Sequence, residues 1–196
     1  MTVILDYGMG NLTSVGKAVE HLGVECRIQK DLKGADKLII PGVGAFKAAM
    51  DRIQPIAHAI QDFAKKGNPL LGICLGQQLL FMESEEFGIC KGLGLLPGKV
   101  KYFPGKIGLK VPHVGWNEVT WSKREGLGRG SVEGEQTYFV HSLYTECADP
   151  EDVAAKTRYG VEFASAVMRK NVWGTQFHAE KSGEVGLRIL KNFLEC

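Results

Sequence analysis

Residues 68–80 read NPLLGICLGQQLL, an apolar run that ends in a cysteine between two glycines and continues into a helical pattern. NPLLGIC predicts a buried strand, and LGQQLLFMESEE, residues 75–86, predicts a helix directly after it. A sharp strand-to-helix turn strains the backbone at Cys74, while Gly72 and Gly76 let the strand and the helix approach closely. The stretch therefore predicts an α/β protein with this cysteine at the carboxyl edge of a sheet.

The preceding residues repeat the same alternation of strands and helices. β-type segments are TVILDYG, VECRIQ and DKLIIPG, and the last is a continuous apolar run typical of a strand buried on both faces. Helical spacing occurs in SVGKAVEHLG, AFKAAMDRI and AIQDFAKKG. This order predicts a mostly parallel central sheet flanked by helices.

The pattern changes in the second half of the chain. Glycine and proline are frequent from about Gly88 to Gly130, and short strands are expected at KVKYF and HVGWNEVTW. QTYFVHS, DVAAKTRYG, FASAVMRK and VWGTQFH follow as strands at hairpin-like spacing, and SGEVGLRILKNFLEC predicts a final helix. We expect an added antiparallel β region that extends the same sheet, with residues 1–196 forming one domain.

Composition excludes several classes of protein. The 196 residues are 44% hydrophobic and 23% charged, with a net charge of +2 and no concentrated basic stripe, which argues against a nucleic-acid-binding protein. No apolar run reaches the roughly 18 residues of a membrane span, and the first residues do not resemble a signal peptide. The five cysteines are scattered without a C-x-x-C pair, so we expect reduced thiols, no metal site and a cytoplasmic location.

Cys74 has two interpretations that the pentapeptide Gly72–Gly76 leaves equally open. It is either a small buried residue at a strand-to-helix junction or a nucleophile presented on a tight turn, whose thiolate the helix N-terminus favours. A nearby base would decide between them. His21 and His58 fall in helical patterns and are expected at the surface, whereas His113 and His141 fit structural histidines.

His178 is the best candidate for that base. It ends the segment VWGTQFH, and Glu180 follows two residues later. Residues two apart in an extended segment point the same way, so the carboxylate can reach one ring nitrogen while the other faces a thiol. H-x-E alone would more often be a surface pair, but combined with the cysteine turn it predicts a nucleophile, a base and an orienting carboxylate.

A thioester-forming cysteine also needs donors for the developing oxyanion. The N–H of Leu75, directly after the nucleophile, is one candidate. The glycine loop PGVG, residues 41–44, ends the preceding predicted strand and is a second. Without the nearby cysteine, this loop would be interpreted as a simple tight turn.

Together these residues resemble the class I (triad) glutamine amidotransferases, whose fold is flavodoxin-like. PGVGAF, GICLGQQLL and QFHAEKS occur in that order, and the match extends over essentially the whole chain. DYGMGN, HVGWNEV and YFVHS narrow the resemblance to the glutaminase subunits of imidazole glycerol phosphate synthase. The resemblance implies hydrolysis of glutamine without a cofactor and transfer of the ammonia to a (β/α)8-barrel cyclase partner in a heterodimer. It further implies that the products are imidazole glycerol phosphate and aminoimidazole carboxamide ribotide, in histidine biosynthesis.

The resemblance also implies roles for matching positions. Cys74 would be the nucleophile, His178 the acid–base and Glu180 the orienting carboxylate. The remaining implied positions are Val43 and Gly44 for the oxyanion, Gln78, Glu86, His141, Ser142 and Leu143 for the substrate, and Asn11, Tyr138 and Lys181 for the partner. Gln78 and Glu86 are expected one and three turns along the predicted helix. For Tyr138, a plain core aromatic is an equally good interpretation.

The chain departs from the family at one position, because Ala179 stands where the family usually has proline between His and Glu. Alanine can adopt the same conformation at some entropic cost, so a working triad is still expected. Other hypotheses are the glutaminase of pyridoxal phosphate synthase, a non-hydrolytic sensor or chaperone with a cysteine at a similar bend, and a phosphate binder using DYGMGN. The last lacks the phosphate-loop pattern.

Overall fold

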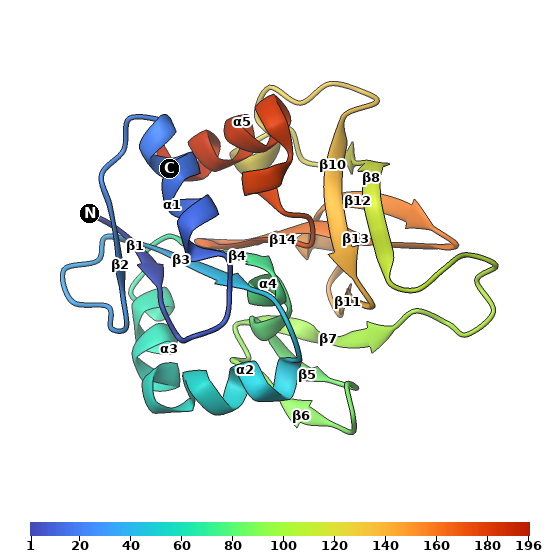
Figure 1. Ribbon diagram of the computed structural model, residues 1–196, viewed down its shortest axis with the longest axis horizontal. Helices are drawn as coiled ribbons and strands as arrows, with labels where there is room; N and C mark the ends of the chain where they lie inside the picture. The colour runs from blue at the N-terminus through green and yellow to red at the C-terminus, as the bar shows by residue number, and fades with distance from the viewer.

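The computed structural model describes residues 1–196, and short strands alternate with helices through the first half of the chain (Figure 1). The α-helices are α1 (Leu12–His21), α2 (Phe46–Ile53), α3 (Ala57–Lys65), α4 (Leu75–Leu79) and α5 (Gly183–Leu194). The early strands are β1 (Thr2–Leu5), β2 (Cys26–Gln29), β3 (Lys37–Gly42), β4 (Leu70–Cys74), β5 (Phe81–Ser84), β6 (Cys90–Lys91) and β7 (Leu96–Tyr102). The later strands are β8 (His113–Glu118), β9 (Thr120–Trp121), β10 (Gln136–His141), β11 (Leu143–Cys147), β12 (Val153–Tyr159), β13 (Val161–Arg169) and β14 (Val172–Thr175).

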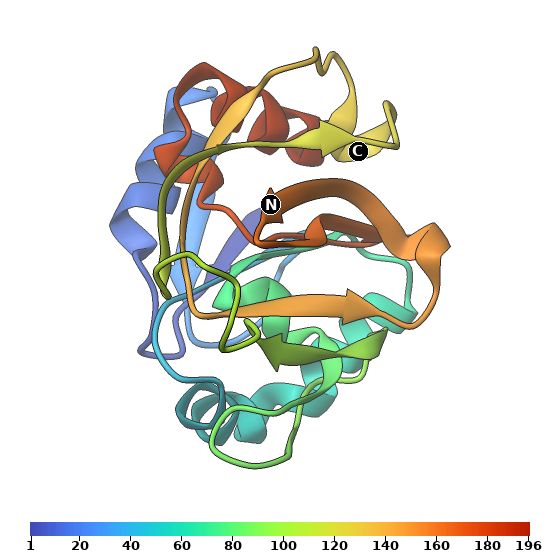
Figure 2. The same ribbon diagram turned by 90° about the vertical axis from the view of Figure 1, so that its right-hand side faces the viewer.

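Five neighbouring strands form the parallel part of the main sheet. Their order is β2-β1-β3-β4-β14, and every pair among them is parallel. Helices α1 and α5 cover one face, while α2, α3 and the short α4 cover the other (Figures 1 and 2). The expected mostly parallel sheet flanked by helices is confirmed, and β14 brings a late segment of the chain next to β4.

The apolar runs of these strands are buried on both faces. Val3 and Leu5 belong to the core cluster on the α2–α3 side, and Ile4 between them belongs to the cluster on the α1–α5 side. Leu38 and Ile40 alternate in the same way with Ile39. Because side chains alternate along a strand, continuous apolar sequence supplies two cores at once.

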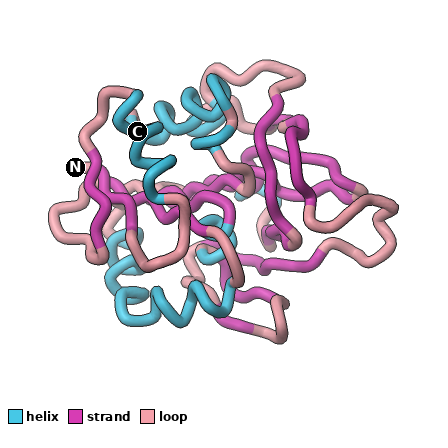
Figure 3. Tube along the Cα trace, in the orientation of Figure 1, coloured by secondary structure: helices cyan, strands magenta, loops and turns pink.

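The second half of the chain adds antiparallel strands, as expected. β13 pairs antiparallel with β14, and β11 pairs antiparallel with both β13 and β7. β8 and β10, however, leave the main sheet and form a separate antiparallel pair that packs beside α5 (Figures 2 and 3). The expectation that the whole region extends one sheet was therefore incomplete. One face of this pair is buried and the other exposed, so it forms a layer of its own.

The predicted helix over residues 75–86 was wrong beyond its first turns. Helix α4 ends at Leu79, and the chain continues as β5, which pairs with β7 and β6. Glu86 therefore lies in the turn after β5 and not three turns along a helix. Pairing with distant strands overrode the helical periodicity of this short segment. The strand β11 was also absent from the sequence-based expectation.

The junction between β4 and α4 is packed tightly against β3. A Cβ atom added at Gly76 would lie 1.7 Å from the carbonyl oxygen of Ile40, and one added at Gly72 would lie 2.5 Å from the carbonyl oxygen of Gly76. Both contacts are with backbone atoms, which cannot move aside as a flexible side chain can. Glycine is therefore required at both positions by the close approach of strand and helix.

Gly76→Ala is expected to lower the free energy of unfolding by at least about 3 kcal/mol, because the methyl group overpacks a site bounded by backbone. Chemical denaturation monitored by circular dichroism measures the change. Gly105→Ala is the matched control, since no atom lies within 4 Å of its added Cβ. Equal stability of the two variants would show that the junction can relax.

Candidate active site

Cys74 occupies a strained turn at the carboxyl end of β4. Its φ of 56° and ψ of −110° lie outside the regions that side-chain-bearing residues commonly adopt, and α4 begins at the next residue. The cysteine is 5% exposed, and it lines a pocket of about 320 Å³. The turn thus directs a largely buried thiol into a cavity and not into the apolar core alone.

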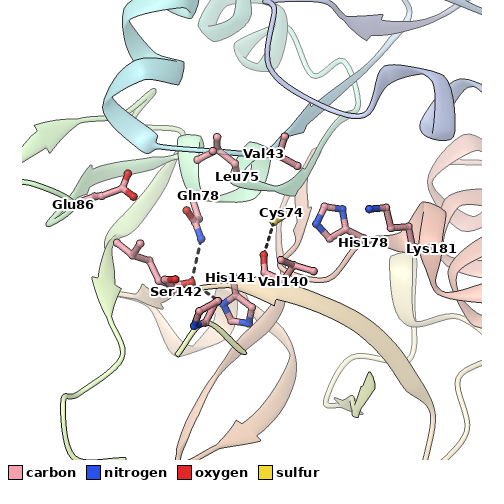
Figure 4. A pocket seen from close by; sticks show the side chains of 13 residues that line it. Val43, Cys74, Leu75, Gln78, Glu86, Val140, His141, Ser142, His178 and Lys181 are labelled. Atoms are coloured by element: carbon pink, nitrogen blue, oxygen red, sulfur yellow. Dashed lines mark hydrogen bonds between the residues drawn. The ribbon is translucent and has the colours of Figure 1, made fainter. Parts of the chain in front are cut away.

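The surroundings of the sulfur are polar. The Sγ of Cys74 lies 3.7 Å from the carbonyl oxygen of Val140 (Figure 4). The Nε2 of Gln176 donates to the same sulfur over 3.9 Å. Val140 comes from β10 and Gln176 from the segment after β14. Residues distant in sequence therefore meet at the thiol that ends β4.

His178 and Glu180 form a buried pair beside this thiol. The Nδ1 of His178 lies 2.8 Å from the Oε1 of Glu180, and the two side chains are 4% and 2% exposed. The other carboxylate oxygen, Oε2, has no hydrogen-bond partner, so the imidazole is the main polar contact of Glu180. The pair lies where the sequence predicted it, but the predicted extended geometry was wrong. Residues Ala179–Lys181 form a 3₁₀ turn that curls the carboxylate back to the ring.

The backbone around His178 is held by β10. The N–H of His178 donates to the carbonyl of Tyr138 over 2.9 Å. The hydroxyl of Ser182 donates to the carbonyl of His178 over 2.6 Å and accepts from the N–H of Tyr138 over 3.0 Å. These three bonds fix the turn that carries the imidazole.

Burial alone would lower the pKa of His178, but its two acidic neighbours reverse the direction. Hydrogen bonds and charge attraction from Cys74 and Glu180 together raise the pKa above its ordinary value. The ring is therefore stabilised in its protonated form when the sulfur carries a negative charge. This arrangement allows an imidazolium–thiolate pair, in which the ring holds a proton ready for transfer.

The glycine loop expected to hold an oxyanion lines the same pocket as Cys74 and His178. Val43, Gly44 and Leu75 all line the pocket with Cys74 (Figure 4). The backbone N–H groups of Val43 and Gly44 donate no hydrogen bond within the chain. They are therefore free donors at the rim of the pocket.

The hydroxyl of buried Tyr7 donates to the carbonyl of Pro41, at the start of this loop, over 2.8 Å. Burial, with a contribution from the charge of Cys74, raises the pKa of this tyrosine. Tyr7 therefore remains a neutral donor that anchors the loop, a contact that sequence reasoning missed.

The expected substrate-binding residues also reach the pocket. Gln78, Glu86, His141, Ser142 and Leu143 line it, although Glu86 arrives from the turn after β5. A carboxylate oxygen of Glu86 accepts the backbone N–H of Phe46 at the start of α2. The Nε2 of Gln78 donates to the carbonyl of Leu143 and to the Oε1 of Gln176, each over 3.1 Å.

The three residues expected at a partner surface come from different elements, and only Lys181 is among those that line the pocket. Lys181 lines the pocket mouth, and Tyr138 is half-buried on β10 beside Trp116, with ring centroids 6.0 Å apart. Asn11 is the N-cap of α1, where its Oδ1 accepts the N–H of Ser14 over 3.3 Å. Asn11 thus has a local structural role that its sequence position did not reveal.

Three residues at the site were missed from the sequence. Pro112 and Val140 line the pocket, and Gln176 contacts both Cys74 and Gln78. Gln176 and Phe177 form a bend after the end of β14, so strand alternation gives no signal for the position of Gln176. Val140 contributes a backbone carbonyl, for which no residue type is diagnostic.

No group of three or more His, Cys, Asp or Glu side chains is arranged to hold a metal ion. None of the helices is both long enough and apolar enough to span a lipid bilayer. His21 and His58 are exposed, as expected, whereas His113 and His141 are buried close to the pocket.

Comparisons with known proteins cover nearly the whole chain. Residues 3–196 match the family model described as glutamine amidotransferase class-I. The protein from Syntrophotalea carbinolica named imidazole glycerol phosphate synthase subunit HisH is 49% identical to this chain, with 98% of each chain covered. The protein of that name from Moorella thermoacetica is 50% identical, with 98% of this chain and 93% of the relative covered.

Solved structures are similar in fold at lower identity. A crystal structure of a glutamine amidotransferase has a TM-score of 0.77 at 19% identity, with 99% of this chain and 97% of the other covered. PurLQS from Thermotoga maritima has a TM-score of 0.75 at 20% identity, with 99% and 96% covered. These two likenesses concern the fold alone.

Glu180→Gln is expected to lower the pKa of His178, because the neutral amide no longer stabilises the imidazolium charge. Titration of the histidine Cε1–H signals by NMR measures the shift. Glu184→Gln, an exposed acidic residue at the start of α5, is the matched control and should leave the titration unchanged. An unaltered His178 titration in the Glu180 variant would contradict the orienting pair.

Ala179→Pro is expected to raise the free energy of unfolding by about 0.4–1 kcal/mol, by restricting the unfolded chain. Ala179 is the first residue of the 3₁₀ turn, its N–H donates no hydrogen bond, and His178 before it is extended with ψ of 95°. Thermal unfolding followed by calorimetry tests this. A lower melting temperature would mean that the buried site has no room for the ring.

Proposed function

The chain belongs to the class I glutamine amidotransferases, and from this premise we propose that it is the glutaminase subunit of an imidazole glycerol phosphate synthase. It would hydrolyse glutamine to glutamate and ammonia and pass the ammonia to a cyclase subunit in histidine biosynthesis. The relatives that share about half of its residues along their full length bear the name of that subunit. This name supports the proposal over the glutaminase of pyridoxal phosphate synthase and over a non-hydrolytic sensor.

The observation that carries the proposal is the meeting of Cys74 and His178 at one pocket, with Glu180 bonded to the imidazole. A strained turn presents the thiol, and a buried carboxylate holds the imidazole beside it. A sensor cysteine at a similar bend does not require a base held by a buried carboxylate. The arrangement is suited to nucleophilic attack followed by proton transfer to a leaving group.

In the first half of the proposed reaction, the Cys74 thiolate attacks the side-chain amide carbon of glutamine. The carbonyl oxygen becomes an oxyanion, for which the N–H of Leu75 and those of the Val43–Gly44 segment are the available donors. The protonated His178 then gives its proton to the departing nitrogen as the carbon–nitrogen bond breaks. The products of this half are ammonia and a γ-glutamyl thioester on Cys74.

In the second half, water attacks the thioester carbon. Neutral His178 removes a proton from that water, and the carbon–sulfur bond breaks to release glutamate and regenerate the thiolate. Glu180 stabilises the imidazolium each time it forms and keeps Nε2 directed at the reacting atoms. A cysteine thioester, rather than a metal or organic cofactor, supplies the chemistry in this proposal.

The released ammonia must stay unprotonated to react with an acceptor, so a sealed route into a partner is advantageous. We propose that the partner is a (β/α)8-barrel cyclase and that it covers the exposed face of β8 and β10. Val114, Trp116 and Val140 are 56%, 54% and 38% exposed on that face, next to Tyr138. An exposed apolar surface of this kind is typical of an interface.

Two further parts of the proposal concern organisation and location. We propose that residues 1–196 act as a single amidotransferase domain, because one continuous sheet includes both β1 and β14. We also place the complex in the cytoplasm, the compartment that keeps a nucleophilic thiol reduced.

Cys74→Ala is expected to lower glutamine-dependent product formation by the complex with the cyclase at least a thousandfold, since no other group can form the thioester (~4 kcal/mol or more). Synthesis from added ammonium salt should remain near the wild-type rate, because the acceptor site lies on the partner. Absorbance of the imidazole-forming reaction measures both.

Cys26→Ala is the control for this experiment, because Cys26 lies on β2 at the far edge of the sheet and is half-buried. It should retain both activities. Persistent use of glutamine by the Cys74 variant would refute the proposed nucleophile. Loss of both activities would instead indicate a failure to assemble with the cyclase.

A further inference from the structure

Two buried histidines that take no chemical step in the proposed reaction are in contact: His141 belongs to the pocket wall and His113 lies behind it. His113 on β8 and His141 on β10 are 2% and 5% exposed. The Nδ1 of His113 lies 2.9 Å from the Nε2 of His141. The Nδ1 of His141 lies 2.7 Å from the carbonyl oxygen of Leu143, and the side-chain nitrogen of Asn117 lies 3.2 Å from the Nε2 of His113. All four ring nitrogens therefore have a partner.

These partners determine where the protons are. The carbonyl of Leu143 can only accept, so the Nδ1 of His141 carries a hydrogen and its Nε2 is an acceptor. The Nδ1 of His113 must then donate to that Nε2, which leaves the Nε2 of His113 to accept from the Asn117 amide. The hydrogen bonds run in one direction from Asn117 to Leu143, and both rings are neutral Nδ1–H tautomers.

The surroundings hold both rings neutral and in place. The ring of His113 is stacked between Phe139 and Tyr159, with centroids 4.7 Å and 3.9 Å away and interplanar angles near 20° (22° and 21°). Burial lowers the pKa of His113 to about 4. Burial likewise lowers the pKa of His141 to about 3, against the opposing effect of the Leu143 carbonyl. Neither ring gains a proton near neutral pH, so the direction of the hydrogen-bond chain is kept.

The chain of bonds ends at the substrate pocket. The Leu143 carbonyl accepts from both His141 and the Nε2 of Gln78, and the second N–H of Gln78 is donated to Gln176. Both N–H groups of the Gln78 amide are thus used in the wall. The atom of this amide that remains for a ligand is Oε1, an acceptor suited to the N–H groups of glutamine.

We propose that His113 is a positioning residue for glutamine binding: through His141 it fixes the Leu143 carbonyl and so keeps the acceptor oxygen of Gln78 directed at the substrate. The inference rests on the proposed glutaminase function for its substrate. Without the donor from His113, the Nε2 of His141 loses its partner, and the ring can change to the Nε2–H tautomer. A lone pair at Nδ1 would then face the Leu143 carbonyl and repel it. Holding the substrate equally in the ground state and the transition state affects KM and not kcat.

The first experiment measures the tautomers directly in the isolated chain. Long-range ¹H–¹⁵N NMR of the histidine rings distinguishes Nδ1–H from Nε2–H, and variants at His113 and His141 assign the signals. Nδ1–H tautomers for both rings at pH 7 are expected. An Nε2–H tautomer or an imidazolium at either position would overturn the inference, whatever the activity of the protein.

The second experiment measures glutamine hydrolysis by the complex with the cyclase. His113→Leu should raise KM for glutamine about three- to tenfold, the effect of one lost hydrogen bond, and leave kcat within about twofold. His113→Asn should restore a KM within about twofold of wild type, since its side-chain N–H can replace the Nδ1 donor. Thr157→Val is the matched control, because it removes a buried hydrogen bond to the carbonyl of Glu118 on β8 without touching the histidines.

The outcomes separate this inference from the proposed function. If the wild-type complex hydrolyses no glutamine, the proposed function fails. If it does, and His113→Leu shifts KM no more than Thr157→Val, or lowers kcat alone, the positioning role fails. A selective rise in KM that His113→Asn reverses supports it. If the leucine variant unfolds, the tautomer measurement on the isolated chain still decides, since an Nε2–H tautomer or an imidazolium at either ring would overturn the inference.

Discussion

The close approach of β3, β4 and α4 is the constraint on which the rest of the site depends. Backbone meets backbone where Gly76 lies against the carbonyl of Ile40, and no side chain can separate them. The chain between strand and helix must then turn within one residue, which places Cys74 at positive φ. Strain of this kind persists only where the surroundings determine it fully, and here the surroundings are the centre of a sheet buried on both faces.

The position of β14 converts that turn into a reactive site. β14 runs parallel to β4, so the carboxyl ends of both strands meet at one edge of the sheet. The residues after β14 consequently pass the sulfur, with Gln176 donating to it and His178 beside it. β10 crosses the same edge and contributes the Val140 carbonyl. Topology, rather than sequence proximity, assembles the thiol and its base.

Much of this architecture could be predicted from the sequence, and the failures have physical causes. Glycine spacing around Cys74 and the apolar runs are local signals that the tertiary structure reinforces. The helix over residues 75–86 failed because β5 is defined by pairing with β7, a contact that local periodicity does not contain. The contact between Glu180 and His178 was predicted for an extended segment, but in the structure a 3₁₀ turn brings the carboxylate to the ring. Contacts made by backbone atoms, such as that of the Val140 carbonyl with the sulfur, cannot be predicted from the type of residue.

The strand β10 contributes both to the surface proposed for the cyclase and to the contacts of the catalytic residues. Its alternation turns the side chains of Tyr138 and Val140 toward the face proposed for the cyclase. The side chain of His141 points to the opposite face, where it is hydrogen-bonded to His113. At the same residues, its backbone binds the other components: the carbonyl of Tyr138 accepts the N–H of His178, and the carbonyl of Val140 lies against the sulfur. A cyclase bound to that face would therefore contact the strand that holds both nucleophile and base. Close-packed interiors transmit strain, so a displacement of β10 at that face would also move the carbonyl groups that contact His178 and the sulfur.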